Sequence, residues 1–297
     1  MFENKFIVRK EFILENRDNE NFVVIDARGD MLKAGDFVYD RAIVLDWKEF
    51  TYLTGKDNEY VGLPFAREVL LEKFSKYGIT PNKKVLIYIN TCPGFGMGED
   101  GRFKFLLNFC GIEAYILDGG ISEILKTDFY KKVEDDKELN KASIDIDNKP
   151  FLSYEKSILT DELKSICKDE SVKILDVRYE EEYNGKIIFG EKFGGHIKRS
   201  KSYPYTKLYD ENGYLLNNSD IEKDILNLGI SKYDLIIVYC TTGIRASIVY
   251  EILSMLGFNV KVSKNVSSDI TVIVKSPVDD KIILEVKGGE VVKNELK

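Results

Sequence analysis

One cysteine stands where a protein can turn a thiol into a nucleophile. Cys240 follows an apolar run, Leu235–Tyr239, that is typical of a buried strand, and a helical pattern begins soon after it. Between the two lies the loop Cys240-Thr241-Thr242-Gly243-Ile244-Arg245. The backbone amides of such a loop, the positive end of the following helix and the charge of Arg245 would all stabilise a thiolate. The sequence therefore predicts that Cys240 is a nucleophile and that residues 241–245 cradle an anion.

The elements that carry this loop occur twice in the chain. Val23-Val24-Ile25-Asp26-Ala27-Arg28 recurs 150 positions later as Lys173-Ile174-Leu175-Asp176-Val177-Arg178. The run from 85 to 90 recurs at the same offset as residues 235–240, and this alignment places Asn90 opposite Cys240. We infer a duplicated domain of about 135 residues whose first copy lacks the nucleophile.

Within each copy, short β-branched runs alternate with helical patterns. In the second copy, residues 173–178 and 235–239 are predicted strands, and residues 220–228 and 246–256 are predicted helices. Apolar strands separated by helices indicate an α/β fold, with a mostly parallel sheet flanked by helices in each copy. The predicted division is a non-catalytic domain over 1–135, a linker over 136–150 and a catalytic domain over 151–268.

The tail after residue 268 departs from the repeat. Runs at 270–274, 281–285 and 291–292 are separated by turn residues and predict antiparallel strands. We expect residues 269–297 to form a small C-terminal β extension that serves packing or dimerisation.

Composition narrows the classes of function. The 297 residues are 44% hydrophobic and 31% charged, as in a folded globular protein, and 43 basic against 50 acidic side chains give a net charge of −7. This acidic balance argues against nucleic acid as the principal partner, whereas a small anion can bind in a locally positive pocket. No run reaches the ~20 apolar residues of a membrane span, and no secretory leader is visible. The four cysteines are too scattered for a disulfide scaffold or a metal site, so we expect a cytoplasmic protein without membrane contact.

Several motifs together resemble the rhodanese family of sulfurtransferases in its tandem-domain form. Leu175-Asp176-Val177-Arg178 resembles the first strand of that family with its Asp-x-Arg signature, and the loop from Cys240 to Arg245 is similar to its active loop. Further similarities lie in Glu181-Glu182-Tyr183-Asn184-Gly185, Gly195-His196-Ile197 and Leu117-Asp118-Gly119-Gly120. In the first copy Phe37-Val38-Tyr39 stands in the place of Gly-His-Ile.

The resemblance implies two rhodanese domains, the first non-catalytic and the second catalytic. Cys240 would take the sulfane sulfur of thiosulfate or 3-mercaptopyruvate as a persulfide and pass it to a thiophilic acceptor such as a thiol or thioredoxin. No metal or other cofactor would be required, and His196 would order a loop rather than act as a base. The residues that would bind the donor and its sulfur are Thr241, Thr242, Gly243, Ile244 and Arg245 in the loop and Arg102 in the first copy.

Two alternatives use a similar fold differently. Related phosphatases and arsenate reductases have a Cys-x5-Arg loop, one residue longer than the spacing from Cys240 to Arg245, so the loop length favours sulfur over phosphate. A sulfur-carrier or binding module would form the persulfide without turnover of small acceptors. The small polar start and basic end of the loop favour thiosulfate as the donor over 3-mercaptopyruvate. The sequence leaves the physiological acceptor and the oligomeric state open.

Overall fold

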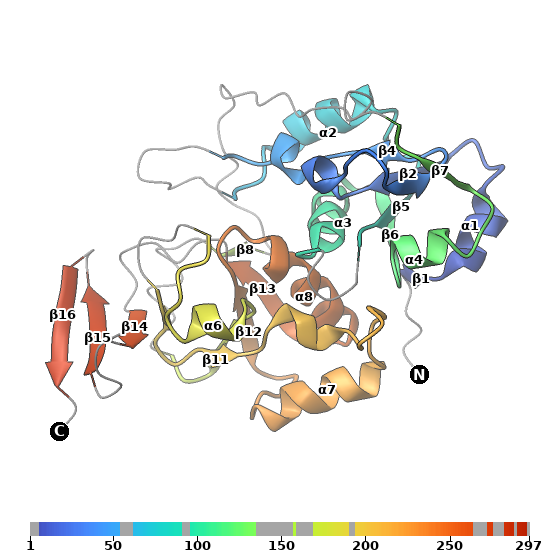
Figure 1. Cartoon of the computed structure of the whole chain (residues 1–297). Helices are drawn as coiled ribbons and strands as arrows, with labels where there is room; N and C mark the ends of the chain where they lie inside the picture. The colour runs from blue at the N-terminus through green and yellow to red at the C-terminus, as the bar shows by residue number, and fades with distance from the viewer. Residues whose placement is uncertain are drawn as a thin grey trace. The chain divides into compact units, whose positions relative to one another are not determined.

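The computed structural model describes two compact units (Figure 1). Unit 1 comprises Met1–Phe151 with Leu208–Asn217, and unit 2 comprises Leu152–Lys207 with Asn218–Lys297. Each unit holds one copy of the repeat and is treated by itself. The described residues are 6–53, 62–90, 96–134, 169–189 and 194–263, together with the backbone of four strands at 157–158, 272–275, 282–287 and 290–295.

Unit 1 is built on a parallel sheet. Its strand order is β1-β6-β5-β2-β4, with bounds Ile7–Val8, Glu113–Leu117, Lys84–Tyr88, Phe22–Asp26 and Ile43–Val44. Helices α1 to α4 span Lys10–Asn16, Arg67–Lys76, Glu99–Cys110 and Ile121–Ile124. Helix α3 packs against β5, β6 and α2. Phe74 of α2 stacks on Phe50 with ring centroids 4.5 Å apart, and Phe103 of α3 meets Phe50 edge-on, so aromatic rings fill this part of the core.

Unit 2 repeats this sheet with the same strand order. The order is β8-β13-β12-β9-β11, with bounds Ser157–Ile158, Asn259–Ser263, Leu235–Tyr239, Val172–Asp176 and Lys201–Ser202, and neighbouring strands are parallel. Helices α6, α7 and α8 span Glu180–Tyr183, Asn218–Asn227 and Ile244–Met255. Residues 244–253 of α8 are all buried, as expected of a helix that is apolar around most of its circumference. The predicted α/β class is confirmed.

The strand registers correct one step of the sequence alignment. Asp26 on β2 pairs with Tyr88 on β5, and Asp176 on β9 pairs with Tyr239 on β12. Tyr88 and Tyr239 are therefore equivalent and 151 positions apart, so the counterpart of Cys240 is Ile89 and not Asn90. Unit 2 therefore has a net insertion of one residue between β9 and β12, relative to β2 and β5 of unit 1. The Gly-Ile turns at 78–79 and 229–230 have the same offset of 151.

Each unit also has an antiparallel strand pair. In unit 1, β3 (Phe37–Tyr39) pairs with β7 (Tyr130–Lys132); in unit 2, β10 (His196–Ile197) pairs with β14 (Val272–Lys275). The amides of Tyr39 and Ile197 both donate to the hydroxyl of the tyrosine that ends the central strand, at 3.0 and 3.1 Å. Phe37-Val38-Tyr39 therefore does occupy the place of the Gly-His-Ile element.

This equivalence relates the C-terminal strands to the repeat. β14 pairs with β10 as β7 pairs with β3, and β15 (Ile282–Lys287) and β16 (Glu290–Glu295) continue this sheet antiparallel. The predicted boundary at 268 and the linker over 136–150 lie outside the described residues and stay predictions. Among the helices of the described part, none has the length and apolar character needed to cross a membrane.

Candidate active site

Cys240 lies at the carboxyl end of β12, directly before the turn that opens α8. Its Sγ accepts a hydrogen bond from the backbone amide of Gly243 at 3.1 Å. Gly243 is the N-cap of α8 and has a φ of 86°, in the left-handed region that favours glycine. Its carbonyl accepts hydrogen bonds from the amide and the hydroxyl of Ser247, at 3.0 and 2.6 Å. The loop is thus held in a turn that directs an amide and the positive end of α8 at the sulfur.

The sulfur is more enclosed than a position at the mouth of a pocket would suggest. Cys240 is 1% exposed, so its side chain is almost completely shielded from solvent. Cys110, on α3, is also buried, and burial raises the pKa of its thiol to about 12. Cys92 and Cys167 lie outside the described residues. Burial alone therefore does not distinguish Cys240 from Cys110; the directed amide does.

Arg245 is committed to a buried carboxylate. Its two terminal nitrogens donate to the two oxygens of Glu182, at 2.5 and 3.0 Å, and one of them also donates to Thr241 Oγ1 at 3.0 Å. The guanidinium carbon lies 5.4 Å from the ring centroid of Tyr179 and 5.0 Å from that of Phe189. Arg245 is 3% exposed and Glu182 is fully buried. The arginine therefore stabilises the loop through Glu182 and Thr241, in addition to placing a positive charge near Cys240.

The charge of Arg245 is maintained by its neighbours. Burial acts to lower the pKa of its guanidinium, but the hydrogen bond with Glu182 and the negative charges of Cys240 and Glu182 raise it more, and the net pKa is raised. Arg178 nearby acts in the opposite direction. Arg245 is consequently a permanent cation whose charge acts on Cys240 through space.

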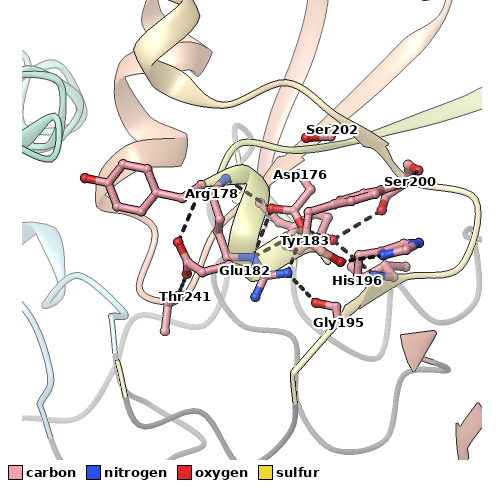
Figure 2. Close-up of polar contacts among 12 residues, drawn as sticks. Asp176, Arg178, Glu182, Tyr183, Gly195, His196, Ser200, Ser202 and Thr241 are labelled. Atoms are coloured by element: carbon pink, nitrogen blue, oxygen red, sulfur yellow. Dashed lines mark hydrogen bonds and ion pairs between the residues drawn. The ribbon is translucent and has the colours of Figure 1, made fainter. Parts of the chain in front are cut away.

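A second network of polar contacts is centred on Asp176 (Figure 2). Arg178 forms a two-pronged ion pair with Asp176, with contacts of 2.9 and 2.6 Å, and donates to the carbonyl of Gly195. Tyr239, the residue before Cys240, donates its hydroxyl to Asp176 at 2.6 Å. Unit 1 repeats this network with Asp26, Arg28 and Tyr88. Since both units have it, the network serves the fold and is not specific to the cysteine.

His196 is engaged within its own unit. Its Nδ1 donates to the carbonyl of Tyr183 at 2.8 Å, and its ring stacks on the Tyr183 ring with centroids 3.7 Å apart. Burial lowers the pKa of the imidazole. Within the described residues no hydrogen bond joins His196 to Cys240. This geometry supports the interpretation that His196 orders the Gly-His-Ile element.

Unit 1 carries different groups at the equivalent strand end. Ile89 replaces the cysteine, and α3 begins after Gly98, which has a φ of 89°, as α8 begins after Gly243. The second helical residue is Asp100 in α3 and Arg245 in α8, so the charge is reversed. Arg102 is 1% exposed and donates to Thr51 Oγ1 at 3.1 Å and to the carbonyl of Gly62 at 2.7 Å.

The comparisons with known proteins agree with this geometry. Residues 159–266 match the model of the rhodanese-like domain. Residues 159–266 therefore form a rhodanese-like domain, as the motifs of the second copy predicted. A thiosulfate sulfurtransferase of Azotobacter vinelandii is 28% identical over 201 residues, covering 66% of this chain and 69% of the relative. A Mycobacterium leprae protein provisionally named thiosulfate sulfurtransferase is 26% identical over 282 residues, covering 88% and 92%.

Two solved structures have a similar fold over most of the chain. The 3-mercaptopyruvate sulfurtransferase SseA from Escherichia coli superposes with a TM-score of 0.66 at 19% identity, covering 87% of this chain and 97% of SseA. A single-substitution variant of EanB in complex with ergothioneine superposes with a TM-score of 0.69 at 20% identity, covering 88% of this chain and 67% of that protein. The tandem rhodanese architecture predicted from the motifs is confirmed.

The sequence motifs identified the loop after Cys240 but not the carboxylate that pairs with its arginine. The loop brings together Cys240, Thr241, Gly243 and Arg245 as predicted from the sequence, whereas the role of Glu182 was missed. Glu182 is one of three consecutive glutamates, and the other two are exposed. Its position three residues after Tyr179, with its carboxylate accepting the Tyr179 amide at 3.0 Å, is the helix-start pattern that could have singled it out.

Proposed function

We propose that this chain transfers a sulfane sulfur from thiosulfate or 3-mercaptopyruvate to a thiophilic acceptor through a persulfide on Cys240. The observation that carries the proposal is the Gly243 amide directed at the Cys240 sulfur at 3.1 Å, at the amino end of α8. The names of the Azotobacter vinelandii relative and of SseA support thiosulfate and 3-mercaptopyruvate as the two donor classes.

In the first half-reaction the Cys240 thiolate attacks the outer sulfur of thiosulfate. A new S–S bond forms to Cys240, the S–S bond of the donor breaks, and sulfite leaves with the bonding electron pair. With 3-mercaptopyruvate a C–S bond breaks instead, and the carbon takes the electron pair and a proton to give pyruvate. The terminal sulfur of the persulfide is anionic, and amides at a helix N-terminus stabilise such a charge.

In the second half-reaction an acceptor thiolate attacks the terminal sulfur. The persulfide S–S bond breaks, the acceptor keeps the sulfur, and Cys240 leaves as a thiolate ready for another cycle. Cyanide can serve as the acceptor in an assay, and a small thiol or the thiol of thioredoxin is the proposed acceptor in the cell. The two steps balance without a metal or other cofactor.

The roles of two arginines in this proposal differ. Arg245 stabilises the loop and its anion, but its commitment to Glu182 and Thr241 argues against the phosphatase alternative, in which the loop arginine must grip phosphate. The prediction that Arg102 binds the anionic end of the donor stays a prediction. Its test is the Michaelis constant for thiosulfate of Arg102→Lys, which we expect to rise while the persulfide still forms on Cys240.

The proposal is tested by the mass of the intact protein after incubation with each donor. We expect the mass to increase by one sulfur atom, the increase to be absent in Cys240→Ser, and the matched variant Cys110→Ala to behave like the wild type. Steady-state turnover with cyanide or dithiothreitol should follow the same pattern. A persulfide without turnover would favour the carrier alternative, and Cys240-dependent hydrolysis of an aryl phosphate would favour the phosphatase.

A further inference from the structure

Glu182 contacts both ends of the loop that starts at Cys240. Its carboxylate accepts two hydrogen bonds from Arg245, at the far end of the loop, and a longer one of 3.5 Å from Thr241 Oγ1, next to the cysteine. One oxygen also accepts the amide of Tyr179, which fixes the carboxylate to the start of α6. A single buried carboxylate thus joins α6 to the two sides of the turn that presents the sulfur.

Unit 1 shows that the fold does not need this carboxylate. It has the same sheet order and the same Asp–Arg–Tyr network, yet the segment after Arg28, residues 29–32, has no buried carboxylate. Its one acidic residue is Asp30, whose side chain is 66% exposed and pairs with Lys48. The position of Arg245 is taken by Asp100 and that of Cys240 by Ile89. The buried ion pair therefore accompanies the cysteine rather than the domain.

The pair also determines the net charge beside the sulfur. Glu182 neutralises most of the charge of Arg245, and a buried cation without its counter-ion would act more strongly on a nearby thiolate. Arg178, which follows β9, also acts on Arg245, and it is itself paired with Asp176. Because these two form an ion pair of their own, Glu182 is the group that offsets the charge of Arg245.

We propose that Glu182 is the positioning residue of the Cys240 loop, holding Thr241 and Arg245 in place and limiting the charge that Arg245 exerts on the sulfur. The inference deepens the proposed sulfurtransferase function and rests on it for its turnover measurement. A purely structural role would change stability and turnover together. The electrostatic part of the role changes the titration of the thiolate, which needs no donor or acceptor.

The test uses Glu182→Gln in the full chain, with Glu181→Gln as the matched control because Glu181 is the adjacent and exposed glutamate. Thiolate absorbance in the ultraviolet, taken as the difference from Cys240→Ser in the same background, gives the titration midpoint of Cys240. We expect the midpoint of Glu182→Gln to fall by about one pH unit. We expect its turnover number with thiosulfate to fall about 10-fold, because the loop is no longer held at both ends. Glu181→Gln should match the wild type in both.

A second variant covers the case in which Glu182→Gln does not fold, since removing one partner of a buried ion pair is strongly destabilising. Glu182→Gln/Arg245→Gln removes both charges, and we expect it to fold with turnover about 10-fold below the wild type. Wild-type turnover in either variant, or an unchanged or raised midpoint in a folded Glu182→Gln, would overturn the inference. If the wild type transfers no sulfur at all, the proposed function fails, and the titration midpoint still decides the electrostatic role of Glu182.

Discussion

Asp100 offers the sharpest quantitative test of how unit 1 tolerates a charge at the position of Arg245. It is 1% exposed, and burial raises the pKa of its carboxyl from 3.8 to about 7, against the opposing hydrogen bond from the Gly101 amide. A carboxyl whose pKa is raised in the folded state keeps its proton where the unfolded chain loses it. The free energy of unfolding is therefore unaffected below about pH 4, falls as the pH rises towards about 7, and is lowest above that.

The size of this effect follows from the shift. A difference of roughly three pKa units corresponds to about 4 kcal/mol, since each unit is worth about 1.4 kcal/mol. Asp100→Asn removes the titration but leaves an oxygen to accept the Gly101 amide, at a fixed cost for its buried NH2 group of about 1–3 kcal/mol that does not vary with pH. The stability of Asp100→Asn relative to the wild type should thus increase by about 4 kcal/mol between about pH 4 and about pH 8.

The assay is urea unfolding at a series of pH values, followed by tryptophan fluorescence. Trp47 is the single tryptophan of the chain and lies in unit 1, so the signal reports on the unit that contains Asp100. Groups that titrate in both variants cancel in the difference. Asp128→Asn, an exposed carboxyl of the same unit, should show no such trend. A difference between Asp100→Asn and the wild type that stays constant across this pH range would refute the reasoning.

Three further predictions concern unit 2 and its counterparts in unit 1. Gly243→Ala forces a φ of 86° on a residue with a side chain, so we expect a loss of about 1–2 kcal/mol in urea unfolding and lower sulfurtransferase turnover. Gly257→Ala, with a φ of 83° at the other end of α8 and no atom near its added carbon, should lose the stability but keep the turnover. Tyr239→Phe and Tyr88→Phe each remove one hydrogen-bond donor from a buried aspartate, so the free energy of unfolding should fall by about 1–3 kcal/mol in each. Sulfurtransferase turnover should fall in Tyr239→Phe and be retained in Tyr88→Phe. Because burial lowers the pKa of His196, its unfolded form binds a proton that the folded form rejects, so stability should fall as the pH drops below about 6.5 and this fall should be absent in His196→Gln.

Much of the fold could be predicted because the strands and helices of both copies have local sequence patterns, namely short apolar runs and helical periodicity. The strand over 235–239 was predicted at its observed bounds, and the helices over 220–228 and 246–256 differ from α7 and α8 by one or two residues at each end. The misplaced equivalence of Asn90 and Cys240 had a physical cause, since a one-residue insertion in a loop changes the offset without altering either strand. Turn residues, here the two Gly-Ile pairs, mark such a change more reliably than strand composition does.

The candidate site was predictable in its centre and not in its surroundings. Cys240, Gly243 and Arg245 lie within six consecutive residues, so their position between a strand and a helix identifies them. Glu182 lies more than fifty residues away from Arg245 in sequence, and its pairing depends on how α6 packs against α8. From the sequence, Arg245 was predicted to interact only with the anion at Cys240. Its pairing with Glu182 could not be predicted, because a distant carboxylate partner cannot be recognised without tertiary structure.

The buried network of aspartate, arginine and tyrosine occurs in both units, whereas the candidate nucleophile occurs only in unit 2. In each unit the network connects the strand that ends in the aspartate (β2 or β9), the central strand (β5 or β12) and the backbone at the start of β3 or directly before β10. Exchanging the few side chains above this common foundation therefore leaves the foundation in place. A domain without the cysteine, such as unit 1, therefore keeps a scaffold on which a reactive residue could be introduced, and Ile89 is the first position at which to introduce one.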